Sequence, residues 1–379
     1  MWFISRTGLG LPDKIHEPPP FSPAEQDPFS AMRSGNLTTF GQNHLRMKER
    51  PKYAVLGGGS WGTALVKMLC ENLDEVHWYM RNTESLDFIR EHAHNPNYLS
   101  SVTFNLSQLR LTDQLDQAVS EADILIFAIP SAFLEKELAK LTVSLEGKIV
   151  FSAIKGIVPE SGKIVGEHFL EHYGIPVKNI GVITGPCHAE EVALERLSYL
   201  TIACVDKEKA EMVATALSSS YIKTKVSNDI IGTEYAAMLK NIYAIAAGIA
   251  HGLGYGDNFQ SVLMSNAIRE MKRYTKRLYN IDRNINHSAY LGDLLVTGYS
   301  TFSRNRMFGN MIGKGYTVKS AMMEMNMVAE GYYAVESAFR IKEAFEKKVK
   351  TPIIDAVYQV LYKDRNPKKI FARLADQIN

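Results

Sequence analysis

The sequence contains few cysteines. Cys70, Cys187 and Cys204 are the only three among 379 residues, and their spacing forms neither a CxxC pair nor a cluster with histidine. A small, scattered and odd number of thiols argues against a disulfide framework and against a structural zinc site. We therefore expect a reducing compartment, namely the cytoplasm, and no bound metal.

A long apolar run is also lacking. The longest one, residues 242–250, is too short to span a bilayer. No apolar core follows the basic residues near the N-terminus, so we expect neither a signal peptide nor stable membrane insertion.

Neither sign of charge is in excess. The chain carries 43 lysines and arginines against 41 aspartates and glutamates, a formal net charge of +2. This balance does not indicate nucleic acid as a partner. One predicted helical face is locally basic, and we interpret it as a solvated surface, with an anionic partner as the alternative. Its members are Arg269, Lys272, Arg273, Lys276 and Arg277.

Residues 1–49 have little that could build a hydrophobic core. Five of the residues between 18 and 28 are proline, and the rest of the segment is rich in small polar residues. This composition predicts disorder. An artefactual extension, with translation starting at Met47, is the alternative.

The remaining chain divides by its hydrophobic pattern into two parts. From 52 to about 227, short apolar runs alternate with amphipathic stretches, which predicts a mostly parallel sheet with helices on both faces. From 229 onward the pattern is helical. We predict an α/β Rossmann-type dinucleotide-binding domain over 50–227 and an all-α domain over 228–379, with the substrate in the cleft between them. The helices expected in the first domain are 87–92, 113–120, 132–141, 164–172, 189–194 and 207–218.

The stretch VLGGGSWGTAL, residues 55–65, has the G-x-G-x-x-G spacing of a dinucleotide-binding turn. The spacing alone is weak, but a β-prone run precedes it and a helical pattern follows, which is the order that the motif requires. Gly57 then permits the tight turn, Gly59 lets a pyrophosphate approach the backbone, and Gly62 lets helix and strand pack closely. A plain glycine turn is the alternative.

An acidic residue is missing where an NAD site usually has one. The next predicted strand, EVHWY, is followed by Met80, Arg81 and Asn82, and the first acid is Glu84. Because an arginine at this place accommodates the 2′-phosphate of NADP, Arg81 favours NADP or the use of both cofactors. A solvated surface arginine is the alternative.

Three loops follow predicted strands, where ligands gather in an open parallel sheet. They are Pro130-Ser131, Lys155-Gly156 and the Gly-Pro-Cys-His turn at 185–188. We predict that Lys155 contacts the nicotinamide side or a phosphate, with a surface lysine as the alternative.

Lys240 is the most informative single residue. Its segment, GTEYAAMLKNIYAIAAGIA, is apolar on nearly every face and predicts a buried helix. A lysine there extends to the surface, pairs with a carboxylate such as Asp293, or projects into a cleft with a lowered pKa and exchanges a proton. Downstream, Ser303, Arg304 and Asn305 offer donors suited to a phosphate. No sequence spacing identifies any of the histidines, His188 included, as a catalytic residue.

Together these residues resemble the soluble, bacterial-type NAD(P)-dependent sn-glycerol-3-phosphate dehydrogenases. The similarity runs from about residue 53 to 372 and rests on several motifs in order, which are far more specific than the glycine turn alone. They are GGGSWGTA, IPS, KG at 155–156, GPCHAEE, LKN at 239–241, GLGYGDN, LGDLLVT, SRNRMFG and VAEG.

The resemblance implies a second domain like the C-terminal domain of 6-phosphogluconate dehydrogenase, and a homodimer. It implies interconversion of sn-glycerol 3-phosphate and dihydroxyacetone phosphate with NAD or NADP, which supplies phospholipid synthesis. Lys240 is the implied proton donor and acceptor, with Asp293 and Lys155 beside it. The implied substrate contacts are Lys155, Gly185, Cys187, Lys240, Asp293, Ser303, Arg304 and Asn305. The implied cofactor contacts are Gly57, Gly59, Ser60, Trp61, Gly62, Arg81, Lys155, Ala189, Arg304, Val328 and Glu330.

The sequence departs from the family pattern at a few positions. Cys187 stands where Ser or Thr is usual, so a hydroxyl contact to the substrate is weakened or replaced by a thiol. Tyr290 and Gly298 also differ from the usual residues.

Two rival functions remain open here: another β-hydroxy-acid dehydrogenase, which would need a carboxylate clamp, and a non-catalytic NADP(H)-sensing module, which would not need both Lys240 and Asp293.

Overall fold

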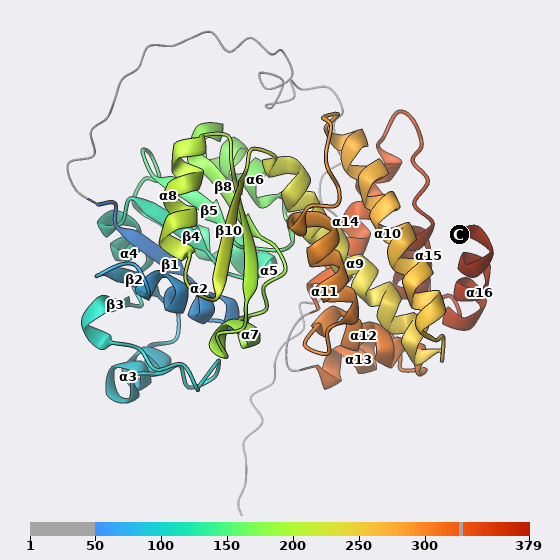
Figure 1. Cartoon of the computed structure of the whole chain (residues 1–379), viewed down its shortest axis with the longest axis horizontal. Helices are drawn as coiled ribbons and strands as arrows, with labels where there is room; N and C mark the ends of the chain where they lie inside the picture. Colours follow the sequence, from blue (N-terminus) through green and yellow to red (C-terminus); the bar gives the residue numbers. More distant parts are fainter. Residues whose placement is uncertain (1–49, 326–328) are drawn as a thin grey trace, which may run out of the picture. The chain divides into compact units, whose positions relative to one another are not determined.

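The computed structural model describes residues 50–325 and 329–379. Strands and helices alternate in its first part, and its second part is helical (Figure 1). The expectations for residues 1–49, including a start at Met47, lie outside the described residues. The first part is built on an eight-stranded sheet, in the order β10-β9-β8-β5-β4-β1-β2-β3. Its strands are β1 (Tyr53–Leu56), β2 (Val76–Tyr79), β3 (Leu109–Thr112), β4 (Ile124–Phe127), β5 (Ile149–Ser152), β8 (Ile180–Thr184), β9 (Ser198–Cys204) and β10 (Ile222–Ser227).

The strands of this sheet pair in parallel except β8 and β9, which are antiparallel. Every residue of β1, β2, β4, β5 and β8 is buried, as expected for strands covered on both faces. A short hairpin of β6 (Ile157–Val158) and β7 (Lys163–Ile164) follows β5. The predicted mostly parallel sheet is confirmed, although the sequence pattern missed β3 and this hairpin, because two to four residues show no clear period.

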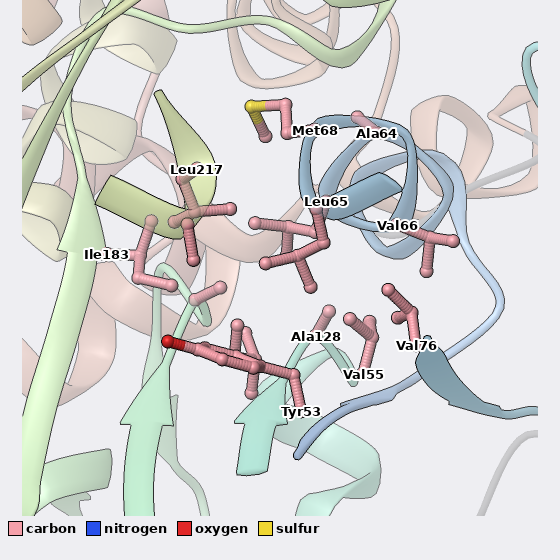
Figure 2. Packing of buried hydrophobic residues seen from close by; sticks show 14 of the residues in the cluster. Tyr53, Val55, Ala64, Leu65, Val66, Met68, Val76, Ala128, Ile183 and Leu217 are labelled. Carbon is pink, nitrogen blue, oxygen red and sulfur yellow. The ribbon is translucent and has the colours of Figure 1, made fainter. Parts of the chain in front are cut away.

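Helices cover both faces of the sheet. On one face, Leu65 and Val66 of α2 pack with Tyr53 and Val55 of β1 (Figure 2). On the other face, Phe169 of α6 packs in the cluster that holds the alternate residues of the same strands. The first cluster draws on α2 (Ser60–Cys70), α3 (Thr83–His92), α7 (Ala189–Ala193) and α8 (Lys207–Leu217), and the second on α4 (Leu115–Glu121), α5 (Ser131–Leu138) and α6 (Val165–Tyr173).

The second part is helical among its described residues, as predicted. Its centre is α9 (Ile230–Gly252), which is buried from 230 to 250 and begins at the N-cap Asp229. Around it pack α10, α11, α12, α14 and α15. The bounds are α10 (Asp257–Leu278), a π-helix (Ser288–Gly292), α11 (Asp293–Tyr299), α12 (Arg304–Gly313), α13 (Val318–Glu324), α14 (Glu330–Glu343), α15 (Pro352–Tyr362) and α16 (Pro367–Gln377).

Helices α9 and α12 meet at glycines. A Cβ atom on Gly309 would lie 2.1 Å from the carbonyl oxygen of Ile245, and one on Gly248 would lie 2.0 Å from that of Arg306. Any side chain at these positions would force the two backbones apart, so the close crossing requires glycine on both helices.

None of the described helices is long and apolar enough to cross a membrane.

Candidate functional site

The glycine turn between β1 and α2 has the geometry that the motif predicts. Gly57 has a φ of +136° and its Cβ would lie 2.6 Å from the carbonyl oxygen of Ala128, while a Cβ on Gly62 would lie 2.1 Å from that of Gly57. A Cβ on Gly59 meets nothing within 4 Å. The outer glycines therefore allow close packing, and the middle one faces open space through which a phosphate can approach the backbone.

The start of α2 presents donors toward the same place. Gly59, its N-cap, supplies no side-chain cap, and the first N–H groups of a helix have no partner within the helix. The indole Nε1 of Trp61 is buried and has no hydrogen-bond partner among the described residues. Free helix-end amides and an orphaned donor suit the acceptor-rich pyrophosphate of a dinucleotide. The residues present therefore fit such a cofactor.

Arg81, after β2, lies beside a carboxylate that the sequence analysis missed. Its side chain is 55 % exposed, with Nη1 3.5 Å from Oε1 of the buried Glu137 on α5. Glu137 also accepts hydrogen bonds from the Tyr79 hydroxyl at 2.8 Å and from Lys140. Burial opposes ionisation of Glu137, but hydrogen bonds from Lys140 and Tyr79 hold its pKa below the usual value. The carboxylate beside Arg81 thus comes from another element, and Arg81 keeps an exposed edge.

A buried ion pair lies between α9 and α11. Lys240 Nζ donates to Asp293 Oδ1, and the two side chains are 3 % and 1 % exposed. The other carboxylate oxygen accepts from the hydroxyl of Thr184, the last residue of β8, at 3.4 Å. The pairing suggested by the sequence is present, and Lys240 does not extend to the surface.

The surroundings of Lys240 shift the pKa of its amine. Burial lowers its pKa to about 8; Asp293 opposes this shift, and the nearby charge of Lys155 adds to it. The amine can therefore change its protonation state close to neutral pH, which is what proton exchange with a substrate requires.

Lys155 connects the glycine turn with α9. Its carbonyl accepts from Asn241 Nδ2 at 2.9 Å, and its Nζ lies 5.0 Å from the ring centroid of Trp61. The ammonium thus faces an indole at the start of α2 and influences the amine of Lys240. This placement supports the functional interpretation over a solvated surface lysine.

The turn at 185–188 follows β8 directly. Gly185 has a φ of +125° and its Cβ would lie 2.6 Å from the Tyr199 carbonyl oxygen. Cys187 is 1 % exposed, and burial raises the pKa of its thiol to about 12, so the thiol stays neutral. Ala189, also buried, begins α7.

His188, which the sequence analysis did not identify as a site residue, lies among the charged groups of this site. Burial lowers its pKa to about 4, and Lys155, Lys240 and Arg304 add to the effect while Asp293 opposes it. Its Nδ1 lies 3.3 Å from Ser300 Oγ. A neutral imidazole therefore joins the turn after β8 to the segment that precedes Ser303. No sequence signal other than its place within GPCHAEE could have identified it.

The predicted phosphate-binding residues begin α12. Arg304 Nη2 donates to Ser60 Oγ at 3.2 Å, which ties this helix to the glycine turn. Ser303 Oγ caps α12 by accepting from the Arg306 N–H at 3.3 Å, and Asn305 Oδ1 accepts from the Gly331 N–H at 2.9 Å. The Ser303 hydroxyl hydrogen and the Asn305 amide group therefore remain as donors.

Glu330 begins α14 near the same cations. Burial raises its pKa, and Lys155, Arg304 and Lys240 act in the opposite direction. Val328, the remaining predicted cofactor contact, lies outside the described residues. The other predicted residues come from the ends of β1, β5 and β8, from the starts of α2, α7, α11, α12 and α14, and, for Lys240, from the middle of α9. Arg81 follows β2.

The sequence matches models of a known family and curated proteins over most of its length. The family models described as the N-terminus and the C-terminus of NAD-dependent glycerol-3-phosphate dehydrogenase match residues 52–210 and 229–372. The glycerol-3-phosphate dehydrogenase [NAD(P)+] of Exiguobacterium sp. is 37% identical over 327 residues, which cover 84% of this chain and 95% of that protein. The enzyme of the same name from Oceanobacillus iheyensis is 35% identical, over 86% of this chain and 94% of its own.

Solved structures show the same arrangement. The crystal structure of glycerol-3-phosphate dehydrogenase from Coxiella burnetii has a TM-score of 0.78 and 25% sequence identity, and it covers 86% of this chain and 99% of its own. With two family models over most of its length and relatives above one third identity, this chain belongs to the NAD-dependent glycerol-3-phosphate dehydrogenase family.

Proposed function

We propose that this protein is an oxidoreductase that interconverts sn-glycerol 3-phosphate and dihydroxyacetone phosphate with NAD(P)H. The observation that carries the proposal is the buried Lys240–Asp293 pair, whose amine lies within electrostatic range of Lys155. The pair, Lys155 and Arg304 all act on His188. The matched relatives bear the name of this activity.

The chemistry divides between cofactor and protein. When bound, the reduced nicotinamide supplies a hydride to the carbonyl carbon of dihydroxyacetone phosphate. Lys240 gives a proton from Nζ to the carbonyl oxygen, which becomes the C2 hydroxyl, and Asp293 holds the amine in place. In the reverse direction the neutral amine accepts the hydroxyl proton.

The other predicted residues bind and orient. Arg304, with the remaining donors of Ser303 and Asn305, would hold the phosphate, because a guanidinium and neutral donors together suit its oxygens. Lys155 would contact the substrate beside the nicotinamide, and Gly185 and Cys187 would line it. Of the cofactor contacts, Gly57, Gly59, Ser60, Trp61 and Gly62 would hold the pyrophosphate, Arg81 the adenosine end, and Ala189, Val328 and Glu330 would complete the site.

The wider biological assignment follows the same resemblance. We propose the domain division 50–227 and 228–379, a homodimer, and a cytoplasmic location in which the product supplies phospholipid synthesis. The three cysteines are free thiols, which agrees with a reducing compartment.

A direct assay tests the activity. Purified protein is mixed with NADPH or NADH and dihydroxyacetone phosphate, and the nicotinamide absorbance is followed. We expect turnover with this substrate and none with a β-keto acid that lacks a phosphate. Turnover of the acid alone would favour the β-hydroxy-acid dehydrogenase, and binding of NADPH without turnover of either would favour the sensing module.

A further inference from the structure

A cavity of about 450 Å³ lies at the ends of β9 and β10, and no residue predicted for the catalytic site lines it. Its walls come from the ends of these strands, the first turn of α9, and the segment around the π-helix. The volume lies in the range of sites that hold small molecules.

The charge of the lining has one sign. Lys207, Lys225 and His287 line the cavity, together with the hydroxyl and amide groups of Thr201 and Asn228, and no aspartate or glutamate does. Lys207 pairs at 3.3 Å with Glu211, and both side chains are more than half exposed. Lys225 has no ion pair within the part of the chain that the structure describes.

Asp206 and Glu208 flank Lys207 in the sequence, and Asp206 pairs with Lys209 at 2.9 Å. Asp229, four residues after Lys225, is already neutralised. Arg283 donates to it from Nε at 2.6 Å and from Nη2 at 3.1 Å. The Tyr290 hydroxyl donates to the same carboxylate, which also caps α9 through the Gly232 N–H at 2.9 Å. Of the two lining lysines, Lys225 is therefore without an ion pair among the described residues and Lys207 has only an exposed one, and an anion is the ligand this lining favours.

The cavity wall is also part of the support of Asp293. Tyr290, in the wall, belongs to the π-helix Ser288–Gly292, and Asp293 is the next residue. Thr201, also in the wall, is the register partner of Thr184, whose hydroxyl donates to Asp293. A ligand here would contact both elements that hold the carboxylate opposite Lys240.

We propose that this cavity is a second binding site, for a small phosphate monoester, and that its occupancy changes turnover through the position of Asp293. Lys207 and Lys225 bind the phosphate, Thr201 and Asn228 donate to its oxygens, and Val205 and Val226 contact the carbon portion. Binding at this site does not depend on the activity proposed above.

The test uses inorganic phosphate as the probe and the full chain carrying Lys207→Gln and Lys225→Gln. Lys223→Gln is the matched control, since Lys223 is exposed on the same strand and does not line the cavity. Phosphate binding is measured by calorimetry at constant ionic strength, in the unmodified chain and in Arg304→Gln, which removes the proposed phosphate anchor of the catalytic site and does not line the cavity.

We expect phosphate binding that persists in Arg304→Gln, and that weakens about tenfold or more in the Lys207→Gln and Lys225→Gln double variant because two charged donors are lost. The kcat and KM without phosphate should stay as in the unmodified protein, while a non-competitive effect of phosphate on turnover disappears. Equal binding in the unmodified protein and the double variant, loss of phosphate binding in Arg304→Gln, or equal weakening in the Lys223→Gln control would overturn the proposal.

Discussion

Replacing Asp293 by asparagine should move the pH dependence of turnover to lower pH. Lys240 has a pKa of about 8, set by burial, which lowers it, and by the Asp293 carboxylate, which raises it. Asparagine keeps the shape and removes the charge, so the pKa of the amine should fall further. Because carbonyl reduction needs the protonated amine, the rate should begin to decline at a lower pH.

The size of the effect follows from the burial of the pair. An opposite charge within hydrogen-bonding distance shifts a pKa by about 1–3 units, and the two side chains are 3 % and 1 % exposed. A shift of about two units is therefore expected. At neutral pH most of the unmodified protein then has a protonated Lys240, whereas only about one tenth of the variant does, which is a roughly tenfold loss of rate.

The assay is kcat against pH in both directions. Alcohol oxidation needs the neutral amine, whose fraction at neutral pH rises from about one tenth to about nine tenths in the variant, so its oxidation rate should rise while its reduction rate falls. Thr184→Val, which removes only the hydrogen bond to Asp293, should shift the profile far less. An inflection that stays in place or moves upward in a folded Asp293→Asn protein would refute the reasoning.

Other changes test other parts of the structure. Lys240→Ala should lower kcat by roughly 10²–10⁴-fold with little change in NADPH affinity, and near-normal turnover of the folded variant would remove the lysine from the mechanism. Arg81→Ala should weaken NADPH by about 1.5–3 kcal/mol but spare NADH; titration with both cofactors decides, and equal losses would contradict it. His188→Ala should raise the KM for dihydroxyacetone phosphate more than it lowers kcat, and His188→Asn should partly restore it, since the asparagine amide can hydrogen-bond Ser300 in place of Nδ1; steady-state kinetics measure both. Burial raises the pKa of Glu270 from 4.5 to about 8, so its contribution to stability is complete below pH 4.5 and is lost as pH rises to about 8. Urea unfolding across this pH range should show a shallower decline in the free energy of unfolding for Glu270→Gln than for the unmodified protein. Parallel declines would refute the shift.

The sequence was informative where a pattern is local. The glycine turn and the buried α9 follow from local spacing, because each pattern lies within one continuous segment of the chain. Arg81 and Glu137 show the limit, since 56 residues separate them and the buried carboxylate comes from a helix whose own pattern gave no sign of its partner. His188 was missed for the same reason, because Ser300 and the cations around it come from distant segments.

The glycine crossing of α9 and α12 has a consequence for which substrates can fit. Lys240 precedes this crossing on α9, and Arg304 begins α12 two residues before Arg306, whose carbonyl lies against Gly248. Since the helices touch through backbone atoms, no rotamer change can alter their separation. The crossing therefore works as a fixed spacer that sets how far the proton donor stands from the phosphate anchor. In the proposed enzyme this fixed separation selects substrates by the distance between their carbonyl and phosphate groups. A substrate one carbon longer would be misaligned either at Lys240 or at Arg304.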